Sequence, residues 1–434
     1  MTEKPLSTEK NLRLSFWDGV FASAMTGFTQ DYFAPFLLFL GATVKQIGML
    51  NAFPNLAAAL MQLVSADVVE KARSRKKIIT FFVFLQALIL IPIALLASTG
   101  KATPQLYIAL VLVFTVCGAF AAPAWGSLMS DIVAENKRGA YFGWRNRTLG
   151  LVSIAGAFCA GFILHLMKKV DIVSGFVIIF SLACIVRLIS WLFLRWMYEP
   201  PLHYKEEHCF SFYQFLARIR ESNFAQFVVF VALMSFSVNL ASPFFAVLML
   251  KDLHFSYLLY SLITLSATLT IFAMMGRWGR HADKVGNLKV IKFTAPLIGV
   301  IPLLWVINRH PLYLIGAQIF SGFLWAGFNL CATNFIYDAV IPEKRTRCLA
   351  YFNVLNGSAL CAGALLGGYL IQVLPPLLGN KILALLLFSS ILRLSVGLAI
   401  PRRLKEVRPV EKVKASELFF SVIGVKPLIE RESK

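Results

Sequence analysis

Two polar residues stand four positions ahead of a proline inside long apolar stretches of the sequence. Asp31 precedes Pro35 in the first stretch, and Asn239 precedes Pro243 in a later one. Proline has no N–H group, so in a helix the carbonyl four residues earlier loses its hydrogen-bond partner. Each pattern therefore sets a free carbonyl beside a polar side chain. Because the two prolines are 208 residues apart in a chain of 434, the pattern recurs once per half.

A carboxylate deep inside an apolar helix is costly, by about 2.5–3.5 kcal/mol on insertion scales, and such residues usually serve a function. Asp31 is therefore a candidate proton acceptor, or a ligand for a cation or a hydroxyl group. The alternative is a structural Asp that pairs with a neighbouring helix. Gln30 points about 100° away from Asp31 around a helix, so we expect one of the two to face the interior.

The composition indicates a helical protein that crosses a membrane many times. Hydrophobic residues make up 58% of the chain and charged residues only 15%, with a mean hydropathy of +0.72. A soluble domain carries about 25% charged residues. Apolar runs long enough to cross about 30 Å of hydrocarbon recur along the whole sequence.

Apolar length and charged punctuation predict twelve spans, six in each half of the chain. We expect an N-terminal six-helix bundle over 1–197, a cytoplasmic linker over 198–223, a C-terminal six-helix bundle over 224–402 and a basic tail over 403–434. The predicted spans are 16–40, 44–66, 77–98, 104–130, 140–166, 172–196, 224–250, 255–276, 288–308, 311–337, 347–374 and 380–401.

The basic residues indicate the orientation of the chain. Of the 42 Lys and Arg residues, 33 fall at the N-terminus, in alternate loops and in the C-terminal tail, and 7 fall in the other loops. The positive-inside rule then places both termini in the cytoplasm, and we expect a multi-pass protein of the inner cell membrane. The net charge of +20 does not indicate nucleic acid, because stacking aromatic residues do not interleave with the basic ones outside the bilayer. No Cys or His spacing indicates a metal site, and we expect no cofactor.

Equivalent residues recur in the two halves at a nearly constant offset. Two pairs are 207 residues apart and one pair is 206 apart, and together with the prolines they run from the first span of each half to the last. The halves are therefore related six-helix units. The three pairs are Asp131 and Asp338, Asn146 and Asn353, and Arg187 and Arg393.

The loops after the second and eighth spans carry a recognisable motif. The later loop reads GRHADKVGNLK, and the earlier one, LVSADVVEKARSRKK, keeps the acid and a basic cluster but lacks the leading glycine. This resembles the G-x-x-x-D-R/K-x-G-R-R loop of the major facilitator superfamily, in the place where that superfamily has it. The residues assigned to these gating loops are Asp67, Arg75, Lys76, Gly279, Asp283, Lys284 and Gly286.

The resemblance implies a fold, a function and roles for several residues. In that superfamily the loops latch the cytoplasmic side when the transporter faces outward, and solute symporters often use an Asp of the first helix for proton coupling. Asp31 matches that position. Two frequent features are missing here: an arginine within the fourth span, and a Gly-Pro pair in the fifth. Their absence weakens the usual coupling assignment and the assignment to drug antiporters.

Further polar and aromatic residues are candidates for lining a solute cavity. An intramembrane amide can equally bond a neighbouring helix, an aromatic residue is more often packing, and Arg145 could bind an anionic solute or form a salt bridge. Arg187 and Arg393 are expected in structural ion pairs, with Asp131 and Asp338 as their natural partners. The cavity candidates beside Asp31 and Gln30 are Asn239, Arg145, Asn146, Asn353, Trp125, Trp325 and Asn329.

The sequence therefore predicts secondary active transport of a small solute by alternating access, with protons coupled through Asp31. The chain has no GxxxxGK[ST] loop for a nucleotide, and no HExxH motif or nucleophile–base pair of a membrane enzyme within its spans. We expect a monomer in the lipid bilayer. The alternative is a non-transporting sensor or a lipid translocase on the same fold.

Overall fold

The computed structural model of the chain describes residues 4–72, 74–98, 103–133, 138–168, 170–200, 222–340 and 342–407. Within these ranges the regular structure is helical, and the only β feature is a single bridge between Leu377 and Asn380. Most of the predicted linker, and the predicted tail from residue 408 on, lie outside the described residues.

The chain divides into two compact units. The first contains Met1–Glu206, Asn239–Leu265 and Leu360–Val373, and the second contains Glu207–Val238, Ser266–Ala359 and Leu374–Lys434. Two segments from the second half of the sequence thus pack with the first unit. The predicted domain boundaries at 197 and 224 stay a prediction.

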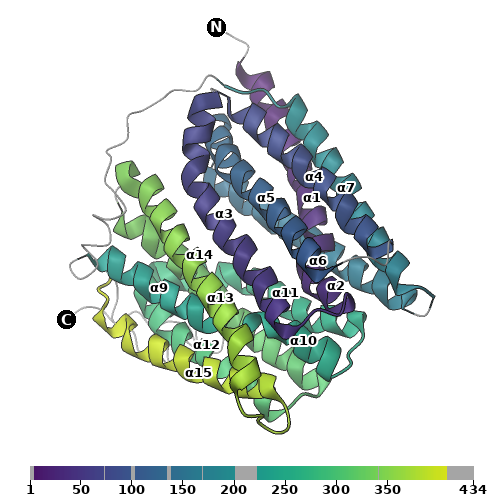
Figure 1. Cartoon of the computed structure of the whole chain (residues 1–434). Coiled ribbons are helices and arrows are strands. Elements are labelled where there is room, and N and C mark those ends of the chain that lie inside the picture. The colour runs from purple at the N-terminus through teal and green to yellow at the C-terminus, as the bar shows by residue number, and fades with distance from the viewer. Residues whose placement is uncertain are drawn as a thin grey trace, which may run out of the picture. The chain divides into compact units, whose positions relative to one another are not determined.

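The helices of the first half pack as an all-helical bundle (Figure 1). Helix α1 lies against α6 and α7, while α4 packs against α5 and α7, and α3 against α5. The first span is interrupted by a 3-10 turn, η1, at Asp31. The elements are α1 (Lys4–Thr29), η1 (Gln30–Tyr32), α2 (Phe33–Phe39), α3 (Val44–Ala72), α4 (Arg75–Ser98), α5 (Pro104–Ile132), α6 (Arg138–Met167) and α7 (Ile172–Trp196).

The second half repeats this order. Its first helix also stops at the polar residue ahead of a proline: α9 ends at Asn239, and a 3-10 turn contains Pro243. The elements are α9 (Asn223–Asn239), η3 (Ser242–Phe244), α10 (Phe245–Val247), the π-helical turn η4 (Leu248–Asp252), α11 (Tyr257–Val285), α12 (Asn287–Ile307), α13 (Pro311–Ala339), α14 (Pro342–Val373), α15 (Lys381–Ala399) and η5 (Pro401–Arg403).

The described helices therefore give six long segments per half, which confirms the predicted twelve-helix fold. Ten of them are apolar and long enough to cross a membrane by themselves. The remaining two are the interrupted segment α1–α2 and helix α3. Exposed apolar side chains such as Phe81 and Ile185 stand on the outer faces of α4 and α7, as expected for helices that contact lipid.

One boundary differs from the prediction. The eighth span was expected to end near residue 276 and to be followed by a loop, but α11 continues to Val285. Gly279, Asp283 and Lys284 are therefore helical, and the connection to α12 is Gly286 alone. Gly286 has φ of 91°, a left-handed conformation that glycine adopts without strain. Helix α11 extends through the charged loop motif because no residue of the motif before Gly286 terminates a helix.

Candidate functional site

A tyrosine from α11 stabilises the break in the first span by a hydrogen bond. Pro35 cannot donate a hydrogen bond to the carbonyl of Asp31, and the hydroxyl of Tyr260 donates to that carbonyl at 3.0 Å instead. Tyr260 is buried, so its hydroxyl also needs such an acceptor. The carbonyl that the proline leaves without a helical partner is thus satisfied by a side chain.

A second tyrosine fixes the other side of the same turn. The Tyr32 hydroxyl donates to the carbonyl of Ala157 on α6 and lies 2.7 Å from the Ser261 hydroxyl on α11. A Cβ atom at Gly161 would lie 2.2 Å from the Ser261 oxygen, so this approach of α6 requires glycine. Three helices therefore meet at the turn that carries Asp31.

The Asp31 carboxylate itself has no partner within the described residues. Its side chain is half-buried, no described side chain donates a hydrogen bond to it, and no described cation lies within ion-pair distance. Gln30 is exposed, so of the two neighbours Asp31 is the one turned toward the protein. An unpaired carboxylate beside a fixed turn can take up a proton or a solute hydroxyl group without first breaking an ion pair.

A separate charge network lies in the interior between α1, α6 and α7. Asp18 is buried, accepts a hydrogen bond from Ser190 at 2.7 Å, and stands 4.0 Å from the guanidinium of Arg145. Arg187 bonds the same Ser190 at 3.1 Å and the side-chain oxygen of Gln86 at 2.9 Å. The prediction that Arg187 pairs with Asp131 is therefore wrong. The reason is position along the helix: Arg187 is in the middle of α7, while Asp131 is at the end of α5.

Arg145 takes the structural one of its two predicted roles. Its guanidinium donates to the carbonyl of Ser15 at 3.1 Å and lies 4.4 Å from the centre of the Trp125 ring. The cation is thus held by a carboxylate, a carbonyl and an aromatic face. Trp125 accordingly packs against a cation of its own unit. Asn146, the next residue of α6, is exposed.

The buried arginine of the second half, Arg393, has only neutral hydrogen-bond partners among the described residues. Arg393 is 2% exposed, and it bonds the Ser389 hydroxyl at 3.0 Å and the carbonyl of Val238 at 3.1 Å. Asp338 instead accepts a hydrogen bond from Asn287 at 2.8 Å. The predicted pairing of Arg393 with Asp338 is therefore wrong for the same reason as its counterpart in the first half.

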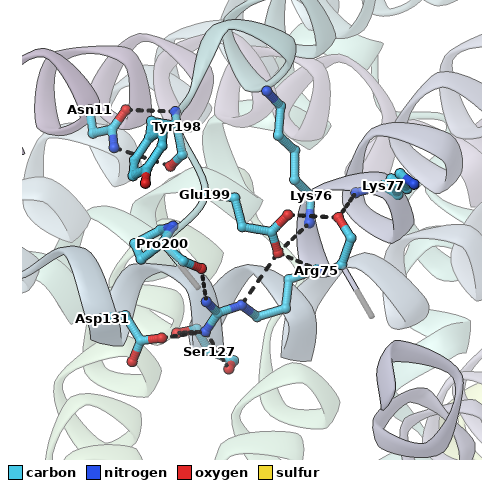
Figure 2. Close-up of polar contacts among 10 residues, drawn as sticks. Asn11, Arg75, Lys76, Lys77, Ser127, Asp131, Tyr198, Glu199 and Pro200 are labelled. Atoms are coloured by element: carbon cyan, nitrogen blue, oxygen red, sulfur yellow. Dashed lines mark hydrogen bonds and ion pairs between the residues drawn. The ribbon is translucent and has the colours of Figure 1, made fainter. Parts of the chain in front are cut away.

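Asp131 pairs with Arg75, a residue assigned from sequence to a gating loop. Arg75 is 1% exposed, and its guanidinium bonds Asp131 at 2.5 Å, Ser127 at 3.2 Å and the carbonyl of Pro200 at 3.1 Å (Figure 2). Glu199 accepts from the backbone N–H groups of Arg75, at 2.6 Å, and Lys76, at 3.3 Å. These are free donors at the first turn of α4, where a carboxylate is favourable.

Figure 2 shows that this arrangement, which we call the Glu199 clamp, extends to α1. The Asn11 side chain bonds both the N–H, at 2.9 Å, and the carbonyl, at 3.1 Å, of Tyr198. The clamp consists of Asn11, Arg75, Asp131, Tyr198 and Glu199, and it ties the chain after α7 to the early turns of α1 and α4 and to the end of α5.

An equivalent Glu406 clamp exists in the second half, 207 residues after Glu199. Glu406 accepts from the N–H of Leu288 in the first turn of α12 at 2.7 Å, and Asn223 bonds both backbone groups of Lys405 at 2.8 and 3.0 Å. The duplication predicted for the spans therefore includes the ends of these helices. The members are Asn223, Asn287, Leu288, Asp338, Lys405 and Glu406.

A cavity of about 260 Å³ lies within the second unit, between α9, α13 and α14. Trp325 and Asn329, two of the residues predicted to line a solute cavity, are part of its wall, and their role toward a solute stays a prediction. Asn353 does not line it, whereas Asn356, one turn further along α14, does. Asn239 is buried at the end of α9 and does not belong to this lining.

Several residues of these networks and of the cavity wall were not predicted from the sequence, although a pattern in the sequence pointed to some of them. Glu199 and Glu406 are 207 residues apart, the offset of the other repeated pairs, and Asn356 is an amide inside an apolar span. Tyr260 had no signal, because nothing local connects it to Asp31. The side chain of Asp67 lies outside the described residues, and Asp283 and Lys284 are exposed. The latch role of those three stays a prediction.

Comparison with known proteins agrees with this architecture. A sequence model described as Major Facilitator Superfamily matches residues 19–221 and 225–430. Among solved structures, a variant of the nucleoside transporter NupG aligns with a TM-score of 0.71 at 14% identity, covering 91% of this chain and 100% of its own. Another NupG structure aligns with a TM-score of 0.67 at 14% identity, covering 92% and 99%. At this identity the likeness concerns the fold. No curated protein matches the sequence.

Proposed function

Because the chain belongs to the major facilitator superfamily, we propose that it is a secondary active transporter in which Asp31 couples solute movement to protons. The transporter works as a monomer in the inner cell membrane, with both termini in the cytoplasm, and moves a small solute by alternating access. The likeness of its fold to that of solved transporters supports the proposal.

The unpaired carboxylate of Asp31 is the observation that carries this proposal. It sits at a break in the first span, which transporters with duplicated halves use to build sites near the middle of the membrane. The other deep charges of the first unit, Asp18, Arg145 and Arg187, are engaged with one another through hydrogen bonds and proximity. Asp31 is therefore the acid best placed to gain and lose a proton during transport.

The hydrogen bonds of the turn around Asp31 connect protonation of its carboxylate to the positions of α6 and α11. Tyr260 and Ser261 hold η1 from α11, and Ala157 holds it from α6. An ionised Asp at the centre of a membrane helix costs about 2.5–3.5 kcal/mol on insertion scales, so neutralising the Asp31 carboxylate changes the free energy of any arrangement that withdraws it from water. A change of that size is enough to shift the balance between two arrangements of these helices.

Proton movement triggered by a solute tests the proposal. Purified protein in lightly buffered liposomes is exposed to fractions of a metabolite pool while a trapped dye reports internal pH. The wild type is compared with Asp31→Asn and with Asp171→Asn as the matched control. Asp171 is exposed and caps α7 by accepting from the N–H groups of Val173 and Ser174, a role that Asn also fills.

The proposal predicts that some fraction drives proton movement in the wild type and in Asp171→Asn but not in Asp31→Asn. Equal movement in all three proteins would remove Asp31 from the coupling role. No movement with any fraction would favour a non-transporting sensor or a lipid translocase.

A further inference from the structure

The cavity in the second unit has walls suited to a flat ring. Trp325 and Phe328 from α13 and Phe352 from α14 line it, together with the amides Asn329 and Asn356 and the hydroxyl of Thr333. None of the described lining residues is ionisable. At about 260 Å³ the cavity lies below the range of drug-sized sites, which favours a small solute over an extended one.

The two amides are available to a ligand. The side-chain oxygen of Asn356 is buried without a hydrogen-bond partner in the described structure. The Asn329 side chain is exposed, and none of the hydrogen bonds among the described residues involves its amide. The Thr333 hydroxyl is already used, because it donates to the backbone carbonyl of Asn329 at 2.9 Å. Buried polar atoms are nearly always paired in folded proteins, so an unpaired amide oxygen on a residue of the cavity wall points to a missing donor.

The first half of the chain has a charge where this cavity has none. Phe352 is 207 residues after Arg145, and Ala332, which also lines the cavity, is 207 residues after Trp125. In the first half the Arg145 guanidinium lies over Trp125 beside Asp18. Phe352 brings no charge to the equivalent place, and a charged solute there would lose its hydration without a counter-ion.

We infer that the α9–α13–α14 cavity binds an uncharged, planar heteroaromatic solute that both donates and accepts hydrogen bonds, such as a nucleobase ring. The aromatic side chains stack on the ring faces. A ring N–H donates to the Asn356 oxygen, and the ring carbonyls accept from the Asn329 amide, since a carboxamide offers both functions. The inference rests on the proposed transport function and names its solute class.

Equilibrium binding to the purified full-length protein in detergent tests this site without requiring transport. Radiolabelled uracil is the probe. Uridine, the anion orotate and the non-aromatic cyclohexanol compete with it at one pH. We expect uridine to compete, which would show that the ring is recognised with or without a sugar. Orotate and cyclohexanol should compete at least about tenfold less well, because the first carries an unpaired charge and the second cannot stack.

Two matched leucine substitutions locate the site, one on α13 and one on α14. Asn329 lies on the helical face formed by residues 325, 328, 332 and 336, all of which line the cavity. Asn334 is a half-buried amide on the same helix, but it lies off that face. Asn329→Leu and Asn356→Leu should each weaken uracil binding about tenfold, the value of one hydrogen bond, while Asn334→Leu leaves it unchanged. Thermal unfolding of each variant confirms that it is folded.

The outcomes separate the binding site from the coupling role. Uracil binding that is unaffected by Asn329→Leu and Asn356→Leu, or that is matched by orotate, would overturn the inferred site. Absence of both uracil and uridine binding in the wild type would also overturn it, even if other solutes trigger proton movement and thereby support transport. Uracil binding that depends on both amides, without any solute-triggered proton movement, would support the site and contradict the coupling role of Asp31.

Discussion

At the scale of single residues, the chain shows how a lost backbone hydrogen bond creates a place for chemistry. Pro35 frees the carbonyl of Asp31, and Tyr260 supplies the hydrogen bond that the helix no longer provides. The carboxylate of the same residue is left without a partner in the described structure. A fixed backbone and an unpaired acid therefore occur at one residue, which holds a group that can titrate in a defined place.

The tyrosine that completes the turn should matter for stability more than its neighbour does. Tyr260→Phe leaves the Asp31 carbonyl without a donor and should lower the free energy of unfolding by about 1–2 kcal/mol. Tyr257→Phe on the same helix serves as the control, since its hydroxyl makes no described hydrogen bond. Denaturant titration in detergent measures both. Equal loss in the two variants would contradict the assigned role of Tyr260.

The buried network of Asp18, Arg145 and Arg187 should depend strongly on its single acid. Asp18→Asn leaves two buried guanidinium groups without a carboxylate and should cost about 3 kcal/mol of unfolding free energy, measured by the same denaturant titration. Adding Arg187→Met removes one of the uncompensated charges and should recover part of the loss. A double variant that is less stable than Asp18→Asn alone would show that the arginine, and not the missing acid, sets the stability.

At the scale of helices, the two glutamate clamps show that the repeat extends to the helix ends. In each half an Asn side chain forms hydrogen bonds with the backbone of the residue just before a Glu. The Glu accepts from free N–H groups at the start of a helix. The partners of these Asn and Glu side chains are backbone groups, which few substitutions can remove. The hydrogen bonds thus join several helix ends within each half. The loop motif assigned to gating from the sequence belongs in part to this structural joint, because Arg75 is a member.

Removing either glutamate should therefore weaken its own helix end. Glu199→Ala and Glu406→Ala should each cost about 1 kcal/mol, the usual loss for a missing helix cap, and Glu199→Gln should cost less because its amide oxygen still accepts. Hydrogen exchange of the first turns of α4 and α12 measures the effect. Faster exchange in both turns from one substitution would show that the clamps are not local.

Element positions were the most predictable part of the structure. The twelve helices, the two proline breaks and the repeated offset follow from apolar length, from a missing N–H group and from residue identity, all of which are local properties. The pairings of Arg187 and Arg393 could not be predicted in this way. They depend on the height of each side chain within its bundle, and several partners, such as Gln86 and Ser389, are neutral residues that a search for opposite charges overlooks.

The residues of the candidate site divide in the same way into those that local sequence predicts and those that depend on packing. Asp31, Trp325 and Asn329 stood out as rare residue types within apolar helices. Tyr260 could not be predicted, because a tyrosine in a membrane helix has no distinguishing pattern. Asn356 lines the cavity where Asn353 was expected. The two amides lie one turn apart on nearly the same face of α14, so the height of the cavity along the helix decides which of them lines it.

At the scale of the whole molecule, the charge distribution sets a testable orientation. Basic residues concentrate at the termini and in alternate loops, 33 against 7, so we expect both termini on the cytoplasmic side. Epitope tags at the two ends should be cut by protease in inverted membrane vesicles and protected in intact spheroplasts. A tag cleaved from the outside would contradict an even number of crossings with this orientation.

Asp31 is proposed to couple two otherwise separable processes, solute exchange and proton flow. Both can be measured in the same liposomes with the solute that triggers proton movement: its exchange at equal pH, and its accumulation driven by an imposed pH gradient. The wild type should do both, while Asp31→Asn should keep exchange and lose accumulation. Accumulation by Asp31→Asn at the wild-type level would contradict the coupling role of Asp31, because coupling would then not require the carboxylate.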